Sequence, residues 1–163
     1  HCPEPGRGLP RSEPVTLDLR EALTEADWEA VRAVRTRVFI EEQGCTPDEE
    51  WDAADAPDAR GRTVHHLLAE ADGAPVGVAR WRIVDGAVKL ERFAVVPEAR
   101  GRGVARALVA HALADARAKG HRRFVLHAQT YVAGLYASFG FARLGGVFDE
   151  AGIEHVKMAL ETG

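Results

Sequence analysis

Apolar and polar residues alternate near the beginning of the chain, at residues 15–19 (Val-Thr-Leu-Asp-Leu), which predicts a half-buried strand. A helix is expected next, because Thr24, with Asp27 three positions later, resembles a capping box. Gly44 is expected to end this helix. Its apolar positions recur at helical spacing and are Trp28, Val31, Val34 and Val38.

Two tight-turn signals in the middle of the chain predict an antiparallel meander of three strands. Each signal is an Asp-Gly pair, at residues 72–73 and 85–86, and such pairs favour two-residue hairpin turns. The apolar runs that they join cover residues 63–71, 75–84 and 87–96.

The second half of the chain alternates helical and strand patterns. Because a helix crosses from strand 87–96 to a short apolar strand at 124–128, these two strands are expected to lie parallel. The predicted fold class is α+β, an α/β three-layer sandwich, with a mixed sheet of six or seven strands and helices on both faces. The remaining expected elements are helices at 104–116 and 131–139 and strands at 141–148 and 153–160.

Length and composition indicate one folded domain. A chain of 163 residues with 46% hydrophobic content can bury one core, and no run approaches the roughly 18 apolar residues of a membrane-spanning helix. Residues 1–13 are rich in Pro, Gly and charge, so we expect a disordered leader there and a single domain over 14–163. The two cysteines, Cys2 and Cys45, favour a reducing, cytoplasmic compartment over a disulfide-bonded one.

Charge is distributed unevenly along the chain. Eight of the 25 acids, and no Lys or Arg, lie between Glu41 and Asp58, which leaves 17 acids against 21 basic residues elsewhere. The net charge of −4 argues against nucleic-acid binding. The acidic stretch is expected to be a loop with at most one helical turn. It is either solvated surface or a wall that attracts a cationic ligand.

The histidines do not predict a metal site. The seven are scattered through the sequence, and the adjacent His65 and His66 would point to opposite faces of a strand. No metal is therefore expected.

Residues 95–105 have the features of an anion-binding loop. A strand ends, a loop with Gly101 and Gly103 follows, and a helix begins directly after it. The first N–H groups of a helix lack partners within it, and the helix dipole adds partial positive charge, so the loop could hold a phosphate. The alternative is a simple turn before a core helix. A nucleoside-triphosphate loop is excluded because its Lys is missing, and the dinucleotide fingerprint fails because Arg106 replaces its third glycine.

On these residues the chain resembles the GCN5-related N-acetyltransferase (GNAT) family. Arg100-x-x-Gly103-x-Ala105 is similar to the family signature Gln/Arg-x-x-Gly-x-Gly/Ala, and residues 90–96 resemble the strand before it. Residues 135–141 (Leu-Tyr-Ala-Ser-Phe-Gly-Phe) resemble the second family landmark, a Tyr on a short helix before a Gly-Phe strand entry. The segments that resemble the ElaA-type branch are residues 38–45, 65–68, 127–129 and 150–155.

The resemblance implies an N-acetyltransferase that takes its acetyl group from acetyl-coenzyme A (acetyl-CoA). An amine of a small molecule or peptide would attack the thioester directly, in a slot where strand 87–96 splays away from strand 124–128. Tyr136 matches the general acid of the family, or else only packs against the cofactor. The residues implied to contact acetyl-CoA are Phe93, Ala94, Val95, Arg100, Gly101, Arg102, Gly103, Val104, Ala105 and Tyr136.

The resemblance also implies an acceptor site beside the slot. Glu91 is a candidate general base, directly or through water, with a cross-strand surface charge as the alternative. Arg92 would point to the face opposite Glu91, where it could bind substrate or pair with an acid. The residues implied to contact the acceptor are Glu42, Gln43, Arg92, Gln129 and His155, although Gln129 could instead cap its strand and His155 could be structural.

Two questions stay open at the level of the sequence. A non-catalytic module that binds acyl-CoA would need the phosphate loop but not Tyr136. Many members of the family form dimers, so a homodimer is left open as well.

Overall fold

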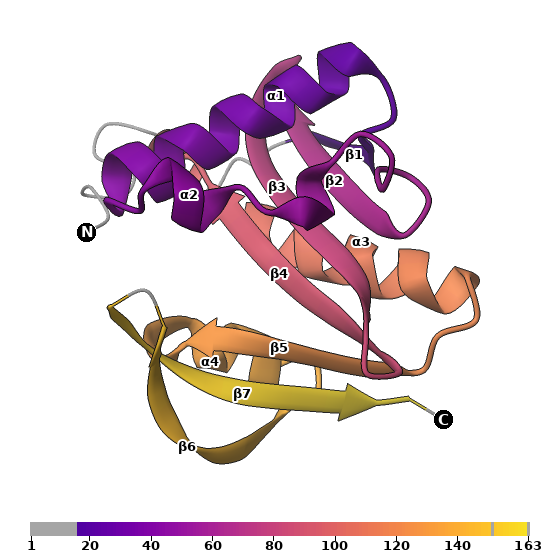
Figure 1. Cartoon of the computed structure of the whole chain (residues 1–163), viewed down its shortest axis with the longest axis vertical. Coiled ribbons are helices and arrows are strands. Elements are labelled where there is room, and N and C mark those ends of the chain that lie inside the picture. Colours follow the sequence, from indigo (N-terminus) through magenta and orange to yellow (C-terminus); the bar gives the residue numbers. More distant parts are fainter. Residues whose placement is uncertain (1–15, 151, 163) are drawn as a thin grey trace.

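A seven-stranded mixed sheet forms the centre of the fold, in the order β1-β2-β3-β4-β5-β7-β6 (Figure 1). The computed structural model describes residues 16–150 and 152–162, and the leader expected at 1–13 lies outside them. The α+β class and the mixed sheet are confirmed. The strands are β1 (Leu17–Glu21), β2 (Val64–Ala71), β3 (Ala74–Val84), β4 (Ala87–Val95), β5 (Arg123–Gln129), β6 (Ala142–Glu150) and β7 (Ile153–Glu161). The α-helices are α1 (Glu25–Arg35), α2 (Pro47–Glu50), α3 (Val104–Ala118) and α4 (Ala133–Ala137).

Helices cover both faces of the sheet, with α1 on one side of β2 and β3 and α3 on the other (Figure 1). Two adjacent residues of β2 mark the two faces. The ring of His66 meets Trp28 of α1 at 4.9 Å, whereas His65 lies beside Asp115 of α3. The prediction that the two histidines face opposite ways is therefore correct. Within the described part of the chain, no helix is long and apolar enough to cross a membrane.

The predicted meander forms from β2, β3 and β4, which pair antiparallel. The backbone of Asp72 and Gly73 is left-handed, with φ of 52° and 80°, and that of Asp85 and Gly86 is the same, with φ of 51° and 80°. Positive φ at both central residues is what a type I′ hairpin turn requires. The Asp-Gly pairs therefore set the register of the central strands.

The strands β4 and β5 pair in parallel, as predicted, but over only part of their length. Their register covers three positions, Val88 with Phe124 through Leu90 with Leu126. Beyond that point β4 continues to Val95 and β5 to Gln129 without pairing with each other, and Figure 1 shows the two strands diverging. The splay expected between these strands is therefore present.

An irregularity in β4 lies where this splay begins. The register between β3 and β4 shifts between Val78 and Arg80, and on the β4 side Arg92 has a φ of 57°. A bulge of this kind bends a strand and redirects a side chain. Left-handed backbone is uncommon for a residue other than glycine, and it tends to occur at functional sites.

The first helical segment differs from the expectation of one continuous helix up to Gly44. The α-helix α1 ends at Arg35, and the chain widens into a π-helical segment, Thr36–Glu42, whose last bonds include Gln43 N–H to the carbonyl of Val38 at 3.0 Å. Gly44, with φ of 80°, ends the segment as predicted. Short π-helical segments are frequent at functional sites.

The acidic stretch and the helix expected at 131–139 each consist of more separate short helical elements than predicted. The acidic stretch contains α2 and a separate 3₁₀ turn, Ala53–Asp55, where at most one turn was expected. The helix expected at 131–139 is a 3₁₀ turn, Thr130–Val132, followed by the five residues of α4. A further 3₁₀ turn, Pro97–Ala99, links β4 to the loop before α3.

Close packing of α3 on the sheet depends on Gly77 of β3. A Cβ at this position would lie 2.8 Å from Val104 Cγ1 and 2.9 Å from Leu108 Cδ1, both in the first turns of α3. Any larger residue would force the beginning of α3 away from β3. Gly77 thus fixes the position of the loop that precedes α3.

Candidate functional site

The loop before α3 has the geometry expected of an anion-binding site. Gly101 and Gly103 both have left-handed backbone, with φ of 78° and 84°, and Gly103 is the N-cap of the 15-residue α3. Among the residues that the structure describes, no side chain caps the helix, and its first backbone bond runs from Ala107 N–H to the carbonyl of Gly103. A Cβ on Gly103 would meet nothing within 4 Å. Unpaired amides, the helix dipole and open space together suit a phosphate group.

The two arginines of this loop differ in their surroundings. Arg102 is exposed, so its charge is available at the rim of the loop. Arg100 instead forms a two-pronged ion pair with Glu42, at 2.5 and 2.6 Å, and its Nε donates to the carbonyl of Val95 at 2.9 Å. Arg100 therefore ties the end of the π-helical segment to β4. This contact also neutralises Glu42, whose pKa lies below its ordinary value mainly because of the hydrogen bonds from Arg100.

Aromatic side chains lie beside the part of β4 that does not pair with β5. The ring of Tyr136, on α4, meets the ring of Phe93 on β4 at 5.9 Å and that of Phe141 at 6.1 Å, both edge to face. Tyr136 is 7% exposed, and burial raises the pKa of its phenol well above its ordinary value. The phenol therefore stays protonated and can act only as a proton donor or a neutral hydrogen-bonding group.

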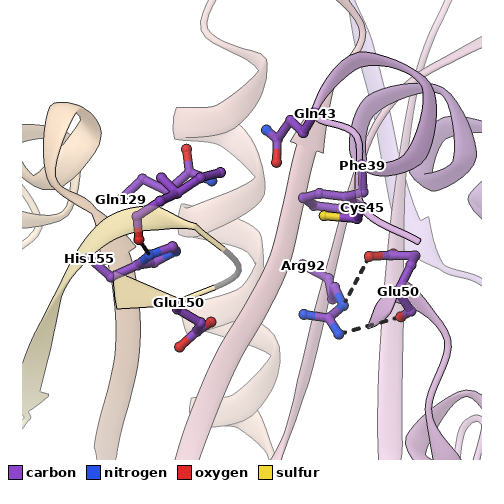
Figure 2. Close-up of a pocket in the computed structure, with 9 residues that line it drawn as sticks. Phe39, Gln43, Cys45, Glu50, Arg92, Gln129, Glu150 and His155 are labelled. Atoms are coloured by element: carbon purple, nitrogen blue, oxygen red, sulfur yellow. Dashed lines mark hydrogen bonds and ion pairs between the residues drawn. The ribbon is translucent and has the colours of Figure 1, made fainter. Parts of the chain in front are cut away.

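A pocket opens at the diverging ends of β4 and β5 (Figure 2). One wall comes from the π-helical segment, the turn after it and β4, and the other comes from β5, β6 and β7. Gln43, Arg92, Gln129 and His155, four of the five predicted acceptor residues, line it. The full lining is Phe39, Gln43, Cys45, Glu50, Arg92, Gln129, Glu150, Ile153 and His155.

The ring of His155 is held in one orientation at this pocket. Its Nδ1 lies 2.7 Å from the carbonyl oxygen of Ile153, and the ring stacks on Phe148 at 6.0 Å with an interplanar angle of 26°. The residue is 7% exposed. His127, on the neighbouring strand β5, instead contacts Glu150 at 2.9 Å and does not line the pocket.

Glu91 and Arg92 do not face opposite ways, contrary to the prediction. Glu91 binds Arg80 at 2.5 Å and Arg82 at 2.6 Å, and Arg80 also binds Asp52 at 2.9 Å. Arg92 reaches toward the same Asp52, at 3.8 Å. The reason is the bulge, since left-handed backbone at Arg92 breaks the alternation of side chains along β4.

The position of Glu91 does not favour it as a base that contacts the acceptor. Burial alone would raise the pKa of Glu91, but Arg82 and Arg80 hold it below its ordinary value. Glu91 also does not line the pocket. A carboxylate bound by two guanidinium groups is a poor proton acceptor.

Part of the acidic stretch is buried and paired with arginines, so it is not a simple solvated loop. Arg35, which is 1% exposed, donates to Glu50 at 2.5 Å and to Asp55 at 2.6 Å. Asp55 also accepts from Arg80 at 3.0 Å. Glu50 reaches the pocket, where Figure 2 shows it facing Arg92, 3.5 Å from the guanidinium Nε. Glu50 therefore forms the floor of the pocket, and Arg35 connects it to Asp55 in the interior.

Sequence reasoning did not assign five of the residues that line the pocket to a site. Phe39 and Cys45 lie in the segment 38–45, and Glu150 and Ile153 lie in 150–155, both of which carry the ElaA-type resemblance. These short segments were the signal that could have identified them. Glu50 carried no such signal beyond its place in a run of acids.

Among the described residues, one group of side chains has the composition of a metal site. The potential ligand atoms of Glu21, His65 and Asp115 lie within 4.8 Å of one another. All three are already hydrogen-bonded, since His65 contacts Glu21 at 2.7 Å and Asp115 accepts from Trp81 and Lys119 at 2.9 and 2.7 Å. A network of this kind is complete without an ion.

Comparison with known proteins places this geometry among acetyltransferases. Residues 40–162 match the family model of the acetyltransferase (GNAT) domain. The uncharacterized N-acetyltransferase YjcF of Bacillus subtilis is 35% identical over 127 residues, which cover 77% of this chain and 86% of that protein. The crystal structure of Escherichia coli ElaA is 26% identical and superimposes with a TM-score of 0.78, covering 90% of this chain and all of that chain. An acyl-CoA N-acyltransferase from Pseudomonas aeruginosa is 28% identical, with a TM-score of 0.75 over 90% of this chain and 99% of that one.

Proposed function

This chain belongs to the GNAT family of acetyltransferases, in its ElaA-type branch, and we propose that it transfers acetyl from acetyl-CoA to a primary amine by direct attack. The acceptor is a small molecule or an amine on a peptide. The proposal is carried by three neighbouring features: the uncapped beginning of α3, the end of β4 that no longer pairs with β5, and the pocket beyond it.

The diphosphate of acetyl-CoA binds the amides of the loop before α3. Gly101 and Gly103 let the backbone approach the anion, and the amides of Arg102, Val104 and Ala105 complete the set. Exposed Arg102 adds a full positive charge. Arg100 acts differently from the expectation, because its pairing with Glu42 makes it a support for the loop and the pocket wall.

The pantetheine arm follows the end of β4 that β5 leaves unpaired. The residues there are Phe93, Ala94 and Val95, and the bound thioester supplies the activated acetyl group. A backbone N–H near Val95 faces the carbonyl oxygen as charge develops on it. One preorganised donor of this kind typically contributes about 10²–10³ in rate.

Tyr136 donates a proton to the departing sulfur. Its ring packs against Phe93, at the strand where the thioester is expected, and its phenol stays protonated because burial raises its pKa. Protonation of the sulfur makes it a better leaving group, and a positioned acid of this type contributes about 10²–10⁴ in rate.

The acceptor enters from the pocket. Gln43, Gln129 and Arg92 supply polar contacts there, and Glu150, which is 46% exposed at its side chain, is a carboxylate that can attract an ammonium group. We favour a cationic amine for this reason. Glu42 contributes less than expected from the sequence, because Arg100 neutralises it.

Two further points belong to the proposal. The chain has two cysteines, Cys2 and Cys45, and this low cysteine content suits a reducing, cytoplasmic location. The strand β6 ends the sheet and exposes Leu144 and Val147 at 48% and 55%, so a second copy of the chain could pair there to form a homodimer.

The test is release of free thiol from acetyl-CoA in the presence of a panel of polyamines, amino sugars, lysine derivatives and short peptides. Transfer to an amine, identified by mass spectrometry of the product, is the expected result. Tight binding of acetyl-CoA without transfer to any member of the panel would favour the alternative, a non-catalytic acyl-CoA-binding module.

A further inference from the structure

We infer that Nε2 of His155 is the group that takes the proton from the acceptor amine. The inference rests on the proposed amine acetylation and adds to it the identity of the base. It depends on three features of this chain: the tautomer of His155, its position, and the engagement of every nearby carboxylate.

The tautomer follows from the hydrogen bond at Nδ1. This nitrogen lies 2.7 Å from the carbonyl oxygen of Ile153, and a carbonyl oxygen can only accept. Nδ1 must therefore carry the hydrogen. In a neutral imidazole the other nitrogen, Nε2, then has a free lone pair. Within the described residues, Nε2 makes no hydrogen bond or ion pair of its own.

The position of His155 places its ring at the pocket where the acceptor is proposed to enter. His155 on β7 pairs with Gln129, the last residue of β5, and β5 has by that point separated from β4. Both side chains line the pocket, and Figure 2 shows the ring of His155 on the wall opposite Arg92. Stacking on Phe148 and burial hold the ring in place, so little reorganisation is needed before a proton transfer.

The carboxylates near the pocket are poorly suited to the same task. Glu50 lines the pocket and burial raises its pKa, but one of its carboxylate oxygens is bound to Arg35 at 2.5 Å and the other lies 3.5 Å from Arg92, so neither is open to an acceptor amine. Glu91 is bound by two arginines and does not line the pocket. Glu150 lines it, but its half-exposed carboxylate contacts His127 at 2.9 Å. Glu150 is thus a group that attracts the ammonium ion, and His155 is the one that deprotonates it.

The proton balance of the reaction is complete with these residues. The acceptor enters as R–NH₃⁺, and His155 Nε2 takes one proton to give R–NH₂. The amine nitrogen attacks the thioester carbonyl, a C–N bond forms, and the C–S bond breaks. The second proton leaves nitrogen for the sulfur through Tyr136, which gives the amide and the free thiol of CoA. His155 then releases its proton to solvent.

The test compares His155→Gln with His127→Gln in full-length protein. Two acceptors of similar shape are used, an alkylamine that is protonated at neutral pH and an alkoxyamine that is mostly neutral. We expect His155→Gln to lower kcat for the alkylamine by about 10²-fold or more. The loss for the alkoxyamine should be at least tenfold smaller, because this amine is already mostly deprotonated before it reacts. Affinity for CoA, measured by calorimetry, should be unchanged in both variants. His127→Gln should leave kcat for both amines at the wild-type value, because His127 contacts Glu150 and any effect through that carboxylate falls on KM.

Equal losses with the two amines, or no loss at all, would overturn the inference, because a residue that only shapes the pocket does not distinguish acceptors by basicity. A second measurement needs no variant. Nitrogen-15 NMR of the wild-type imidazole is expected to show the Nδ1-protonated tautomer of His155, and protonation at Nε2 in the neutral ring would also overturn it. If the wild-type protein acetylates neither amine nor any other, the proposed function fails instead.

Discussion

Substitution of Arg35 by Met tests whether the buried ion pairs beneath the pocket hold α1 and the acidic stretch to the sheet. Arg35 is 1% exposed and makes four hydrogen bonds, two to the carboxylate of Asp55, one to that of Glu50 and one to the carbonyl of Glu50. Methionine fills a similar space but leaves both carboxylates without their main partner. The same change at Arg32, on the same helix, is the control, because Arg32 is half exposed and its nearest acid, Glu29, is 3.8 Å away.

The expected magnitude follows from the burial of the group. Removing one partner of a buried ion pair typically costs about 3–5 kcal/mol, because a charge stays buried without compensation. A domain of this size has about 5–15 kcal/mol of stability, so Arg35→Met should remain folded but be strongly destabilised. An exposed pair contributes about 0–1 kcal/mol, and Arg32→Met should therefore change the free energy of unfolding by less than about 1 kcal/mol.

The dependence of stability on pH gives a second readout of the same contact. Burial alone would raise the pKa of Asp55, but its bonds to Arg35 and Arg80 lower it from 3.8 to about 2. A lowered pKa in the folded state means that ionised Asp55 stabilises the protein above about pH 4, and that this contribution is lost as the pH falls toward 2. Arg35→Met should reduce this contribution, so acid unfolding should begin at a higher pH than in the wild type.

Urea denaturation of the two variants at neutral pH, followed by an acid titration monitored by circular dichroism, makes the measurement. A loss below about 1 kcal/mol for Arg35→Met, equal to that of Arg32→Met, would refute the reasoning. It would mean that water or a rearrangement compensates the two acids, and that the buried network does not hold the floor of the pocket.

Three further changes test the site. Gly103→Glu should lower CoA affinity by about tenfold or more relative to the control Gly103→Ala, measured by calorimetric titration. Both variants carry the backbone strain at φ of 84°, but only Glu adds a carboxylate at the phosphate loop. Equal affinities of the two variants would contradict the assignment of the loop. Tyr136→Phe should lower kcat by about 10²–10⁴-fold, because the proton donor is lost. It should leave CoA affinity unchanged, because the ring still packs in the same way. An unaltered rate in a thiol-release assay would exclude the acid role. Gly77→Ala should lower the free energy of unfolding by about 1–3 kcal/mol in thermal unfolding, because the Cβ of the alanine would press on Val104 and Leu108 of α3. The same shift of α3 should weaken CoA binding. Wild-type stability of this variant would show that the close contact is not a constraint.

The order of elements in this fold could be predicted because local signals determine it. The two Asp-Gly pairs require left-handed backbone and so specify hairpins, and the crossover helix between β4 and β5 requires their parallel pairing. The anion-binding character of the loop before α3 could be predicted for the same reason, because Gly101 and Gly103 directly precede the helix in the sequence. The separation of β4 from β5 came from the resemblance to a family and not from any local signal.

The floor of the pocket could not be predicted, because its contacts join residues that are far apart in the sequence. Glu50 and Asp55 look like members of a solvated acidic run, yet Arg35 and Arg80 bring them into the interior from 15 and 25 positions away. The bulge at Arg92 could not be predicted either. Nothing in the sequence marks an arginine for left-handed backbone, and this one residue decides that Glu91 and Arg92 reach the same group of acids.

The central claim is that the amides at the beginning of α3 bind the diphosphate of CoA, while the thioester lies along the end of β4 that does not pair with β5. A crystal structure of the protein with CoA tests it most directly. The account predicts phosphate oxygens within hydrogen-bond distance of backbone N–H groups of residues 101–105, with the thiol between β4 and β5 and facing Tyr136. Diphosphate bound away from this loop, or a thiol outside the gap between the two strands, would contradict it.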